Sequence, residues 1–318
     1  MADANVGALV ATTLRNRRKS LADNVTANNA LLDRMDKKGQ LKEVAQGGRT
    51  IFEPLIYGSN SSVQFYDGYD TFTPPTVTQE TIDGSEWNWK QLGGFVAISG
   101  REQVMNSGKA QVVDLVEARI KQLQAQLRNT ASTSLYSDGT GSSGKEFGGL
   151  RLIVADDPTA AGTVGGINQV SEPFWRNYFS AAAATTSSTI KSRMNAAWLN
   201  TIRGTDKVDL ILADDDMFTY YWTSLQEQAR FTSAKEADAG FTSLKYMSAD
   251  VVYDDACPDK HMYFLNTDSL AFRYAPNRWF EVGDAQKVLN ADYSVTPVWV
   301  MGNLTCNNRA LNGVVIAS

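Results

Sequence analysis

The sequence predicts an α+β fold built around one unusually long helix. Apolar residues recur at three- and four-residue spacing over about 100–134, which is typical of one amphipathic helix. Along the rest of the chain, helix and strand patterns mix without the regular alternation of a doubly wound sheet. At about 1.5 Å per residue, the helix would span roughly 45–50 Å. This is too long for the core of a compact domain of this size, so we expect an elongated molecule.

Composition narrows the possible functions. The chain has 318 residues, of which 43% are hydrophobic, enough to bury a sizeable core. Its net charge of −5 argues against a protein that coats nucleic acid over its whole surface. No apolar run approaches the roughly 18 residues of a membrane span, so no membrane association is expected. Cys257 and Cys306 are too few for a disulfide framework, which fits synthesis in a reducing cytoplasm.

Residues 1–45 are polar and rich in Asn and Ala, and we expect them to form an N-terminal arm that lies on another surface. Within this arm, Asn28–Lys38 predicts a short helix that ends at Gly39. A basic cluster, which precedes this helix, could contact phosphates without sequence specificity or pair with acidic groups on another protein chain. The cluster consists of Arg15, Arg17, Arg18 and Lys19.

Residues 46–85 predict an extended hairpin. Two β-prone runs, Thr50–Tyr57 and Val63–Tyr69, flank the turn residues 58–61. A lone hairpin is marginally stable in water, so its apolar surface needs a partner. An ordinary edge hairpin folded onto its own domain has the same pattern. The aromatic side chains that would supply the contact surface are Phe52, Tyr57, Phe65, Tyr66, Tyr69 and Phe72.

The long helix has a clear beginning. Strand patterns over Glu86–Lys90 and Phe95–Ile98 lead into it. Ser99 and Glu102 then form a capping box, in which the two side chains satisfy free backbone N–H groups of the first turn. The charged residues of the helix that we take as candidates for contacts between chains are Arg101 and Arg119.

The second half of the chain mixes helices and strands. Ser137–Gly149 is rich in Gly and Ser and predicts a loop, whereas Val208–Ala213 predicts a buried strand. Thr189–Arg203 and Met217–Arg230 have the apolar spacing of helices. Shorter strands are predicted at Val251–Tyr253, Met262–Leu265, Leu270–Tyr274, Val298–Met301 and Gly313–Ile316.

One motif suggests a nucleotide hydrolase. Gly139–Lys145 matches G-x-x-x-x-G-K, the loop whose backbone N–H groups cradle phosphates, and Leu210–Asp214 resembles a strand that ends in a magnesium-binding aspartate. Glu146, however, stands where Ser or Thr would bind magnesium. The loop also follows a long helix, whereas a phosphate site needs a loop leading into one. A P-loop hydrolase is therefore the weaker hypothesis, and we expect no catalytic residue and no cofactor.

No metal site is expected either. Asp214–Asp216 precede a predicted helix, where aspartates cap free N–H groups. The pairs at 156–157 and 254–255 are typical of turns, although a loosely bound calcium ion at one of them stays an alternative. His261, the single histidine, lies beside an apolar run and is more typical of a strand edge than of a catalytic base.

A series of short stretches from about Asn29 to the C-terminus is informative through its order and spacing. They are Asn29-Ala-Leu-Leu-Asp-Arg-Met, Gly48-Arg-Thr-Ile-Phe-Glu-Pro-Leu, Glu86-Trp-Asn-Trp-Lys-Gln, Ile98-Ser-Gly-Arg-Glu, Leu115-Val-Glu-Ala-Arg-Ile-Lys, Tyr136-Ser-Asp-Gly-Thr-Gly, Gly148-Gly-Leu, Val154-Ala-Asp-Asp-Pro-Thr, Thr163-Val-Gly-Gly-Ile-Asn, Phe241-Thr-Ser-Leu-Lys-Tyr-Met, His261-Met-Tyr-Phe-Leu-Asn-Thr and Gly302-Asn-Leu-Thr-Cys. Together they resemble the major capsid proteins of tailed bacteriophages, whose shell fold is shared with encapsulin compartments.

The resemblance implies a division of the chain. It implies an arm at 1–45, an extended loop at 46–85, a peripheral domain with a spine helix at 86–171 and 276–318, and an axial domain at 172–275. It also implies that hexamers and pentamers tile an icosahedral head around double-stranded DNA. The extended loop and the arm would then reach neighbouring subunits.

By the same resemblance, the expected partners are a scaffolding protein, a portal, a decoration protein, and packaged DNA in non-specific contact. The expected location is the virion, after assembly in the cytoplasm of a bacterial host. The chain begins close to its arm, which favours a separate scaffolding protein. Some relatives cross-link neighbours through a lysine of the extended loop, but no lysine occurs between Gly47 and Trp89, so we predict a non-covalent shell. An encapsulin-like cellular compartment stays an alternative.

Overall fold

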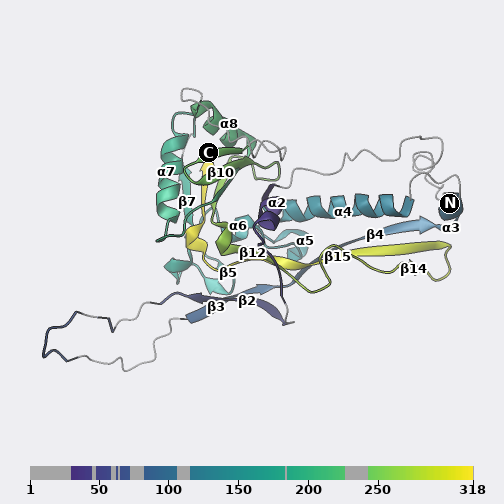
Figure 1. The fold of residues 1–318 in the computed structure, drawn as a ribbon, viewed down its shortest axis with the longest axis horizontal. Helices are drawn as coiled ribbons and strands as arrows, with labels where there is room; N and C mark the ends of the chain where they lie inside the picture. Colours follow the sequence, from purple (N-terminus) through teal and green to yellow (C-terminus); the bar gives the residue numbers. More distant parts are fainter. Residues whose placement is uncertain are drawn as a thin grey trace.

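The computed structural model describes residues 30–44, 48–58, 62–63, 65–71, 82–105, 115–182, 185–225 and 243–317. Figure 1 shows an elongated molecule in which two projections leave a body of packed helices and sheet. One projection contains β4 (Lys90–Ser99), part of β15 (Tyr293–Cys306) and α4 (Leu115–Ser134); the other is the extended loop beyond β2 (Thr50–Ile56) and β3 (Ile82–Asn88). Helices and strands mix without β–α–β alternation, so the predicted α+β class is confirmed.

The body contains a six-stranded sheet in the order β7, β16, β11, β8, β10, β9. Its strands are β7 (Tyr178–Ala182), β8 (Leu210–Ala213), β9 (Ser243–Tyr246), β10 (Ala249–Tyr253), β11 (His261–Leu265) and β16 (Gly313–Ala317). Leu210 and Leu212 of β8 face one hydrophobic core, whereas Ile211 and Ala213 face a second core. The continuous apolar run of β8 is therefore explained by burial on both faces of the sheet.

Helices cover both faces of this sheet. α7 (Ile190–Thr201) and α8 (Asp215–Ser224) pack on one face, where Met194 and Met217 are fully buried. α6 (Leu150–Ile153) contributes to the core on the opposite face. The two predicted helices at 189–203 and 217–230 are confirmed as α7 and α8, with the residues after 225 lying outside the described part.

The first described helix belongs to the body. α2 (Ala30–Lys37) ends where Gly39 adopts a φ of +67°, a conformation that favours glycine. Leu31, Leu32 and Met35 lie in the same hydrophobic core as α6. This part of the expected arm therefore packs on its own chain, while residues 1–29 lie outside the described residues.

One long strand connects the body with the projection. The C-terminal part of β15 pairs with β12 (Leu270–Tyr274), and its N-terminal part pairs with β4. Gly302 takes part in both pairings, opposite Tyr274 and Lys90. A Cβ atom at Gly302 would lie 2.5 Å from the carbonyl oxygen of Arg273, so this position accepts only glycine without a shift of the backbone.

Shorter elements complete the fold. β1 (Leu41–Glu43) runs parallel to β12, and β13 (Glu281–Val282) and β14 (Gln286–Lys287) pair with β15. The remaining elements are α5 (Gly141–Gly144), β5 (Thr163–Val164), β6 (Ile167–Asn168) and the 3₁₀ turns η2 (Pro173–Trp175), η4 (Thr267–Ser269) and η5 (Arg309–Leu311).

The predicted long helix is described as two pieces, α3 (Gly100–Met105) and α4, with 106–114 outside the described residues. The capping box is confirmed: the N–H of Glu102 donates to Ser99 Oγ, and the N–H of Ser99 donates to a carboxylate oxygen of Glu102, both at 3.2 Å. α4 ends at Ser134, as the apolar spacing predicts, and packs along β4.

The hairpin differs from the prediction in its second strand. β2 pairs with β3 in antiparallel register from Thr50–Asn88 to Ile56–Ile82. The run Val63–Tyr69, predicted as the partner, forms no strand in its described residues. The prediction was wrong because the turn residues Asp67 and Gly68, which lie in the run, and Asp70, which follows it, outweigh the β propensity of the aromatics. They form a turn in which the N–H of Asp70 donates to the carbonyl of Asp67 at 2.7 Å.

Two details complete the description. The last strand, β16, pairs with β7 and β11 in the body sheet, and the expected assignment of 276–318 to a peripheral domain stays a prediction. The loop at 137–149 contains the short helical turn α5, in which Ser142 and Ser143 have positive φ values.

Candidate interaction surface

The extended loop exposes most of its aromatic side chains. Phe65 and Tyr69 are fully exposed, and Tyr66 is 65% exposed. Phe52 on β2 is also exposed, whereas Tyr57 stacks on Phe174 of its own chain with ring centroids 5.0 Å apart. The sixth candidate, Phe72, lies outside the described residues. The structure thus exposes four of the six predicted aromatics.

The two-stranded sheet at the loop base is apolar on both faces. Its inner face buries Ile51, Leu55 and Trp87 in the body core. Its outer face exposes Phe52, Ile56 and Ile82. The Phe52 ring lies over Gly84, where an added Cβ would come within about 2.0 Å of the ring, so glycine is needed for this packing. An apolar outer face of this kind is typical of a contact surface.

The loop base is firmly attached to the body. Arg273 donates to both carboxylate oxygens of Glu53, at 2.6 and 3.0 Å, and the hydroxyl of Thr305 donates to the same carboxylate at 3.0 Å. Nearby, Ser85 Oγ donates to the carbonyl of Cys306 at 3.1 Å and accepts from Trp87 Nε1 at 3.0 Å. These buried contacts fix the direction in which the loop leaves the body.

A groove of about 1030 Å³ lies beside this base. Its walls combine apolar residues of β2 and η2 with amides and carboxylates of the body. The charged side chains that line it are Arg203, Asp206 and Asp268. The lining residues include one serine, Ser269, but no histidine and no cysteine.

The two arginine candidates have different surroundings. Arg119 donates to both carboxylate oxygens of Glu102, at 3.3 and 3.0 Å, and to the carbonyl of Ala97 at 3.0 Å. It therefore ties α4 to the start of α3 and the end of β4. Arg101 is exposed on α3 and is the better placed of the two for a contact with another chain. The basic cluster Arg15, Arg17, Arg18 and Lys19 lies outside the described residues.

The geometry does not support the phosphate-binding motif. Gly139–Lys145 follows α4 and forms α5, and the next helix, α6, has only four residues. Within the described residues 137–153, no helix of more than four residues begins where a bound phosphate would need a helix N-terminus. The side chain of Lys90 donates to the carbonyl of Gly144, so one carbonyl of the loop faces an ammonium group of the same chain.

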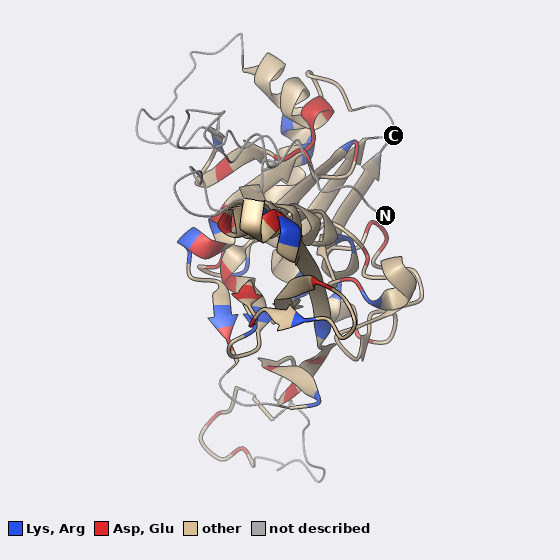
Figure 2. Cartoon of the chain, turned by 90° about the vertical axis from the view of Figure 1, so that its right-hand side faces the viewer, with Lys and Arg blue, Asp and Glu red and all other residues tan. Residues whose placement is uncertain are grey.

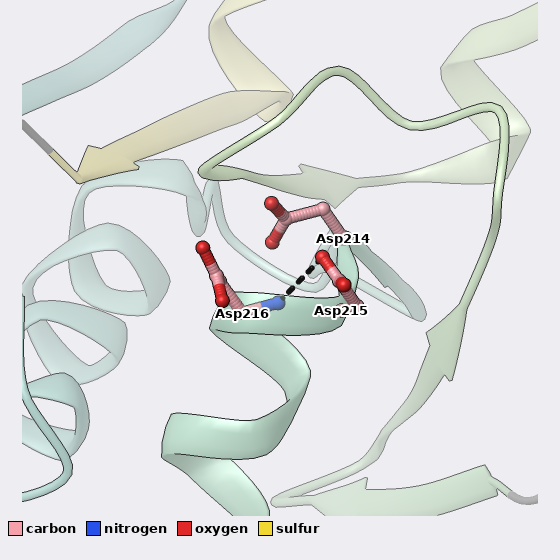
Figure 3. Close-up of side chains that lie close together, drawn as sticks. All are labelled: Asp214, Asp215 and Asp216. Carbon is pink, nitrogen blue, oxygen red and sulfur yellow. Dashed lines mark hydrogen bonds between the residues drawn. The ribbon is translucent and has the colours of Figure 1, made fainter.

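Asp214, the first of the three consecutive aspartates in Figure 3, is the N-cap of α8, and Asp215 and Asp216 lie in its first turn. Asp214 Oδ1 accepts from the N–H of Met217 at 2.9 Å, and its Oδ2 accepts from the N–H of Lys260. Asp215 Oδ1 accepts from the N–H of Asp216 at 2.9 Å. Burial raises the pKa of Asp214, although both backbone hydrogen bonds favour the charged form. The predicted capping role is confirmed for Asp214.

The single histidine has a structural environment. His261 opens β11, with Nδ1 2.6 Å from the carbonyl of Asp259 and Nε2 3.2 Å from Asp156 Oδ1. Burial alone lowers the pKa of His261, but the Asp156 carboxylate and the Asp259 carbonyl raise it overall. Both ring nitrogens thus face oxygens of the same chain, which is not the arrangement of a free catalytic base.

One buried carboxylate was not indicated by any local sequence pattern. Asp254, predicted as a turn residue, accepts from the N–H of Ala256 at 3.0 Å, as a turn requires. It also accepts from the N–H of Leu31 at 3.1 Å and from the hydroxyl of Tyr136 at 2.8 Å. It is fully buried, and this burial raises its pKa. Asp254 therefore joins α2, the end of α4 and β10, elements that are far apart in sequence.

Among the described residues, no helix is both long and apolar enough to cross a membrane. No protein-family model matches the sequence. No curated protein matches it either.

Solved structures do resemble this chain. The capsid asymmetric unit of cyanophage A-1(L) is similar over 94% of both chains, with a TM-score of 0.69 and 16% identity. The SrpI encapsulin from Synechococcus elongatus PCC 7942 covers 99% of this chain and 96% of its own, with a TM-score of 0.61 and 11% identity. The capsid of Myoviridae phage XM1 covers 96% and 98%, with a TM-score of 0.57 and 12% identity. The chain therefore has the shell fold found in phage capsids and encapsulins.

Proposed function

We propose that this chain is the major capsid protein of a tailed bacteriophage, a structural subunit and not an enzyme. The observation that carries the proposal is the shared shell fold over nearly the whole chain, combined with an extended loop whose aromatic side chains are exposed. In this proposal, hexamers and pentamers of the chain form an icosahedral head around double-stranded DNA.

The proposed mechanism is mechanical. Each subunit offers apolar surface on its loop that a neighbour would bury, and many such contacts around a closed shell add up to a stable particle although each is weak. Phe65 and Tyr69 supply rings that are fully exposed in the single chain, and Phe52, Ile56 and Ile82 supply the outer face of the loop base. The anchored base supports this mechanism because it presents the loop in one direction.

Further partners follow from the same proposal. A scaffolding protein would guide assembly, and a portal would occupy one vertex. Packaged DNA would be contacted without sequence specificity, and a decoration protein would be a further partner. Assembly would take place in the cytoplasm of the bacterial host, and the mature location would be the virion.

The encapsulin similarity favours a second candidate, a cellular compartment that encloses protein cargo. The contents of particles purified from cells that naturally produce the chain distinguish the two. Nuclease-protected double-stranded DNA supports the capsid, whereas a protein cargo without DNA supports the compartment.

The first test is negative-stain electron microscopy of the purified chain, alone and co-expressed with its neighbouring genes. We expect closed icosahedral particles or rings of five and six subunits. A monomer under every condition contradicts the proposal. In that case nucleotide binding by the parent chain and its loss in Lys145→Ala would revive the hydrolase hypothesis.

A second variant links assembly to the loop. Phe65→Ala combined with Tyr69→Ala should prevent or strongly reduce particle formation while the circular dichroism spectrum stays unchanged, because both rings are exposed in the monomer. Lys145→Ala is the matched control. Lys145 is exposed and lies in the loop that follows α4, which is separate from the extended loop. Normal particles from the double variant would contradict a role of these rings in assembly.

A further inference from the structure

The sequence contains dipeptides that are prone to a rearrangement of the main chain. In this reaction the nitrogen of a glycine attacks the side-chain carbonyl carbon of a preceding Asp or Asn and closes a five-membered succinimide ring. Glycine favours the reaction because it has no Cβ atom beside the nitrogen and leaves the backbone free to rotate. The four pairs are Asp67-Gly68, Asp83-Gly84, Asp138-Gly139 and Asn312-Gly313. Their surroundings decide which of them can react.

The body holds Asn312-Gly313 away from the reaction. Asn312 is fully buried, and its Oδ1 accepts from the N–H of Asn266 at 3.0 Å. Its Nδ2 donates to Ser269 Oγ at 2.9 Å and to the carbonyl of Asn308 at 3.1 Å. Gly313 begins β16 and lies between β7 and β11. Ring closure at this pair would require the central sheet to open first.

The side chain and the nitrogen of Asp138-Gly139 are both engaged elsewhere. Asp138 Oδ1 accepts from the hydroxyl and the N–H of Thr140, at 2.7 and 2.9 Å, and these bonds lower the pKa of Asp138. A lower pKa reduces the protonated fraction of the carboxyl group, which is the form that can lose water. The N–H of Gly139 donates to Ser137 Oγ at 3.2 Å and not to the Asp138 carboxylate.

Asp83-Gly84 has the required contact but not the required freedom. The N–H of Gly84 donates to Asp83 Oδ1 at 2.8 Å. Both residues lie in β3, in register with Leu55 and Pro54 of β2. The ring of Phe52 covers Gly84, where an added Cβ atom would lie 2.0 Å from it. Ring closure rotates the main chain at Asp83 and would therefore break the pairing of the hairpin.

Asp67-Gly68 combines the contact with freedom of movement. Both residues are exposed in a turn of the extended loop, and an added Cβ atom at Gly68 would meet nothing within 4 Å. The N–H of Gly68 donates to Asp67 Oδ1 at 2.9 Å, so the attacking nitrogen lies beside the carboxyl group. Figure 2 shows acidic but no basic residues on the described end of the loop, and no lysine or arginine occurs from Thr50 to Trp89. No basic residue of the loop therefore restrains this carboxylate.

We propose that Asp67-Gly68 is a site of spontaneous isoaspartate formation, and that this rearrangement makes an unassembled subunit less able to join a shell. The first part depends only on the chemistry of the loop. The second part rests on the proposed shell function. The four pairs thus differ in reactivity, and the reactive one lies between side chains that we propose to mediate assembly.

The rearrangement balances with water as its only co-reactant. As the bond between the Gly68 nitrogen and Asp67 Cγ forms, the carboxylic acid loses its hydroxyl group and the nitrogen loses its proton, so one water molecule leaves. Solvent water then adds to the succinimide. Attack at Cγ restores Asp67. Attack at the main-chain carbonyl breaks its bond to the Gly68 nitrogen, which leaves a free main-chain carboxylate and a chain joined through Cγ.

The product changes the geometry of the loop without changing its mass. The main chain becomes one carbon atom longer, because Cβ of residue 67 is now part of it. Phe65 and Tyr69 lie on opposite sides of the pair, and their rings are fully exposed. The additional atom changes the spacing and direction of one ring relative to the other. A neighbouring surface that fits both rings of the parent chain would therefore no longer fit both.

Peptide analysis of the ageing full-length chain tests the first part. The unassembled chain is incubated at mildly acidic pH and digested with trypsin, which releases Thr50–Lys90 as one peptide that contains two of the pairs. Electron-based fragmentation cleaves the additional Cα–Cβ bond of isoaspartate and so locates it. A hydrogen bond that must open lowers the reactive population by roughly two- to tenfold, so we expect at least about fivefold more isoaspartate at Asp67 than at Asp83.

A single substitution connects the modification with assembly. Gly68→Ala places a methyl group beside the attacking nitrogen, and the folded chain accepts it because the site is open and its φ lies outside the left-handed region. The variant should form little isoaspartate and should keep its initial particle yield after ageing, whereas the parent chain should lose yield as isoaspartate accumulates. Gly48→Ala is the matched control; it adds the same methyl group to the loop base and should age like the parent.

The outcomes separate this proposal from the proposed function. Equal isoaspartate at Asp67 and Asp83, or none at either, overturns the modification site and leaves the shell function untouched. Isoaspartate at Asp67 with an unchanged particle yield overturns the effect on assembly, as does an equal loss of yield in Gly68→Ala. If the fresh parent chain forms no particles under any condition, the proposed function fails, while the peptide measurement still decides the modification site.

Discussion

The body sheet and the hairpin of the extended loop are both β-structure, but they bury their side chains differently. β8 and β11 are covered on both faces, with Phe264 and Leu212 fully inaccessible. The β2–β3 hairpin is covered on one face only and exposes Phe52, Ile56 and Ile82 on the other. The body is thus complete within one chain, whereas the hairpin has apolar surface left for another molecule. Substitutions in the two regions should therefore affect different measurements.

The largest effect on stability is expected in the body. Phe264→Ala removes a fully buried ring between α7, α8 and the sheet, which should cost about 3–5 kcal/mol of unfolding free energy. Urea denaturation followed by circular dichroism measures this. A loss below about 1 kcal/mol would mean that the second core is much looser than its burial indicates.

An intermediate effect is expected at the junction between the two regions. Arg273→Met leaves the nearly buried Glu53 carboxylate without its cation, which should cost about 1–3 kcal/mol, since Arg273 itself is partly exposed. The same denaturation assay applies. The double variant Arg273→Met/Glu53→Leu should recover much of this loss; if it is no better than the single variant, the pair is not the source of the effect.

A smaller, pH-dependent effect is expected at His261. The pKa of His261 is raised in the folded chain. Its contribution to the unfolding free energy is therefore fully present at pH values below its ordinary pKa near 6.5, and it is lost as the pH rises through the folded pKa. Burial raises the pKa of Asp156, but His261 and Arg151 lower it by more, so the pKa is lowered overall. The contribution of Asp156 to the unfolding free energy is therefore lost only in acid. His261→Gln should therefore destabilise by about 1 kcal/mol near pH 6 and by less near pH 9. Equal losses at both pH values would exclude the ion pair as the cause.

The smallest effect on stability is expected at the loop. Phe65→Ala should change the unfolding free energy by less than about 0.5 kcal/mol, because the ring touches solvent in the single chain. The same substitution should lower particle yield in electron micrographs. A clear loss of monomer stability would show that Phe65 packs within its own chain. Phe65 would then be a core residue like Phe264, and the difference between the two regions would disappear.

Sequence patterns located the elements whose signals are local. The capping box at Ser99 and Glu102, the helix that became α7 and the buried run of β8 each depend on residues close together in the chain. The hairpin was also expected to need a partner surface for its aromatics, because a lone hairpin is only marginally stable in water. Periodicity and capping chemistry are sufficient for such features.

Features that depend on residues far apart in the sequence could not be predicted from such local patterns. β2 pairs with β3 across 25 intervening residues, and the intervening aromatic run looked equally suited as a partner. The full length of β15 was missed because its partners change along the strand. Arg309 is fully buried and donates to Gln169 and Asn177, which no local pattern indicates for a charged side chain. Burial of charge is decided by tertiary contacts, and the burial lowers the pKa of Arg309 to about 10.

The change of partner along β15 has a consequence for how a shell of such subunits would deform under internal pressure. Force applied at the Tyr293 end loads the hydrogen bonds between β15 and β4 together, in shear, so the projection moves as one beam with α4 along it. At Gly302 the partner changes from β4 to β12, and the residue has no side chain to brace the backbone. Bending would therefore concentrate at this position, where the two pairings meet.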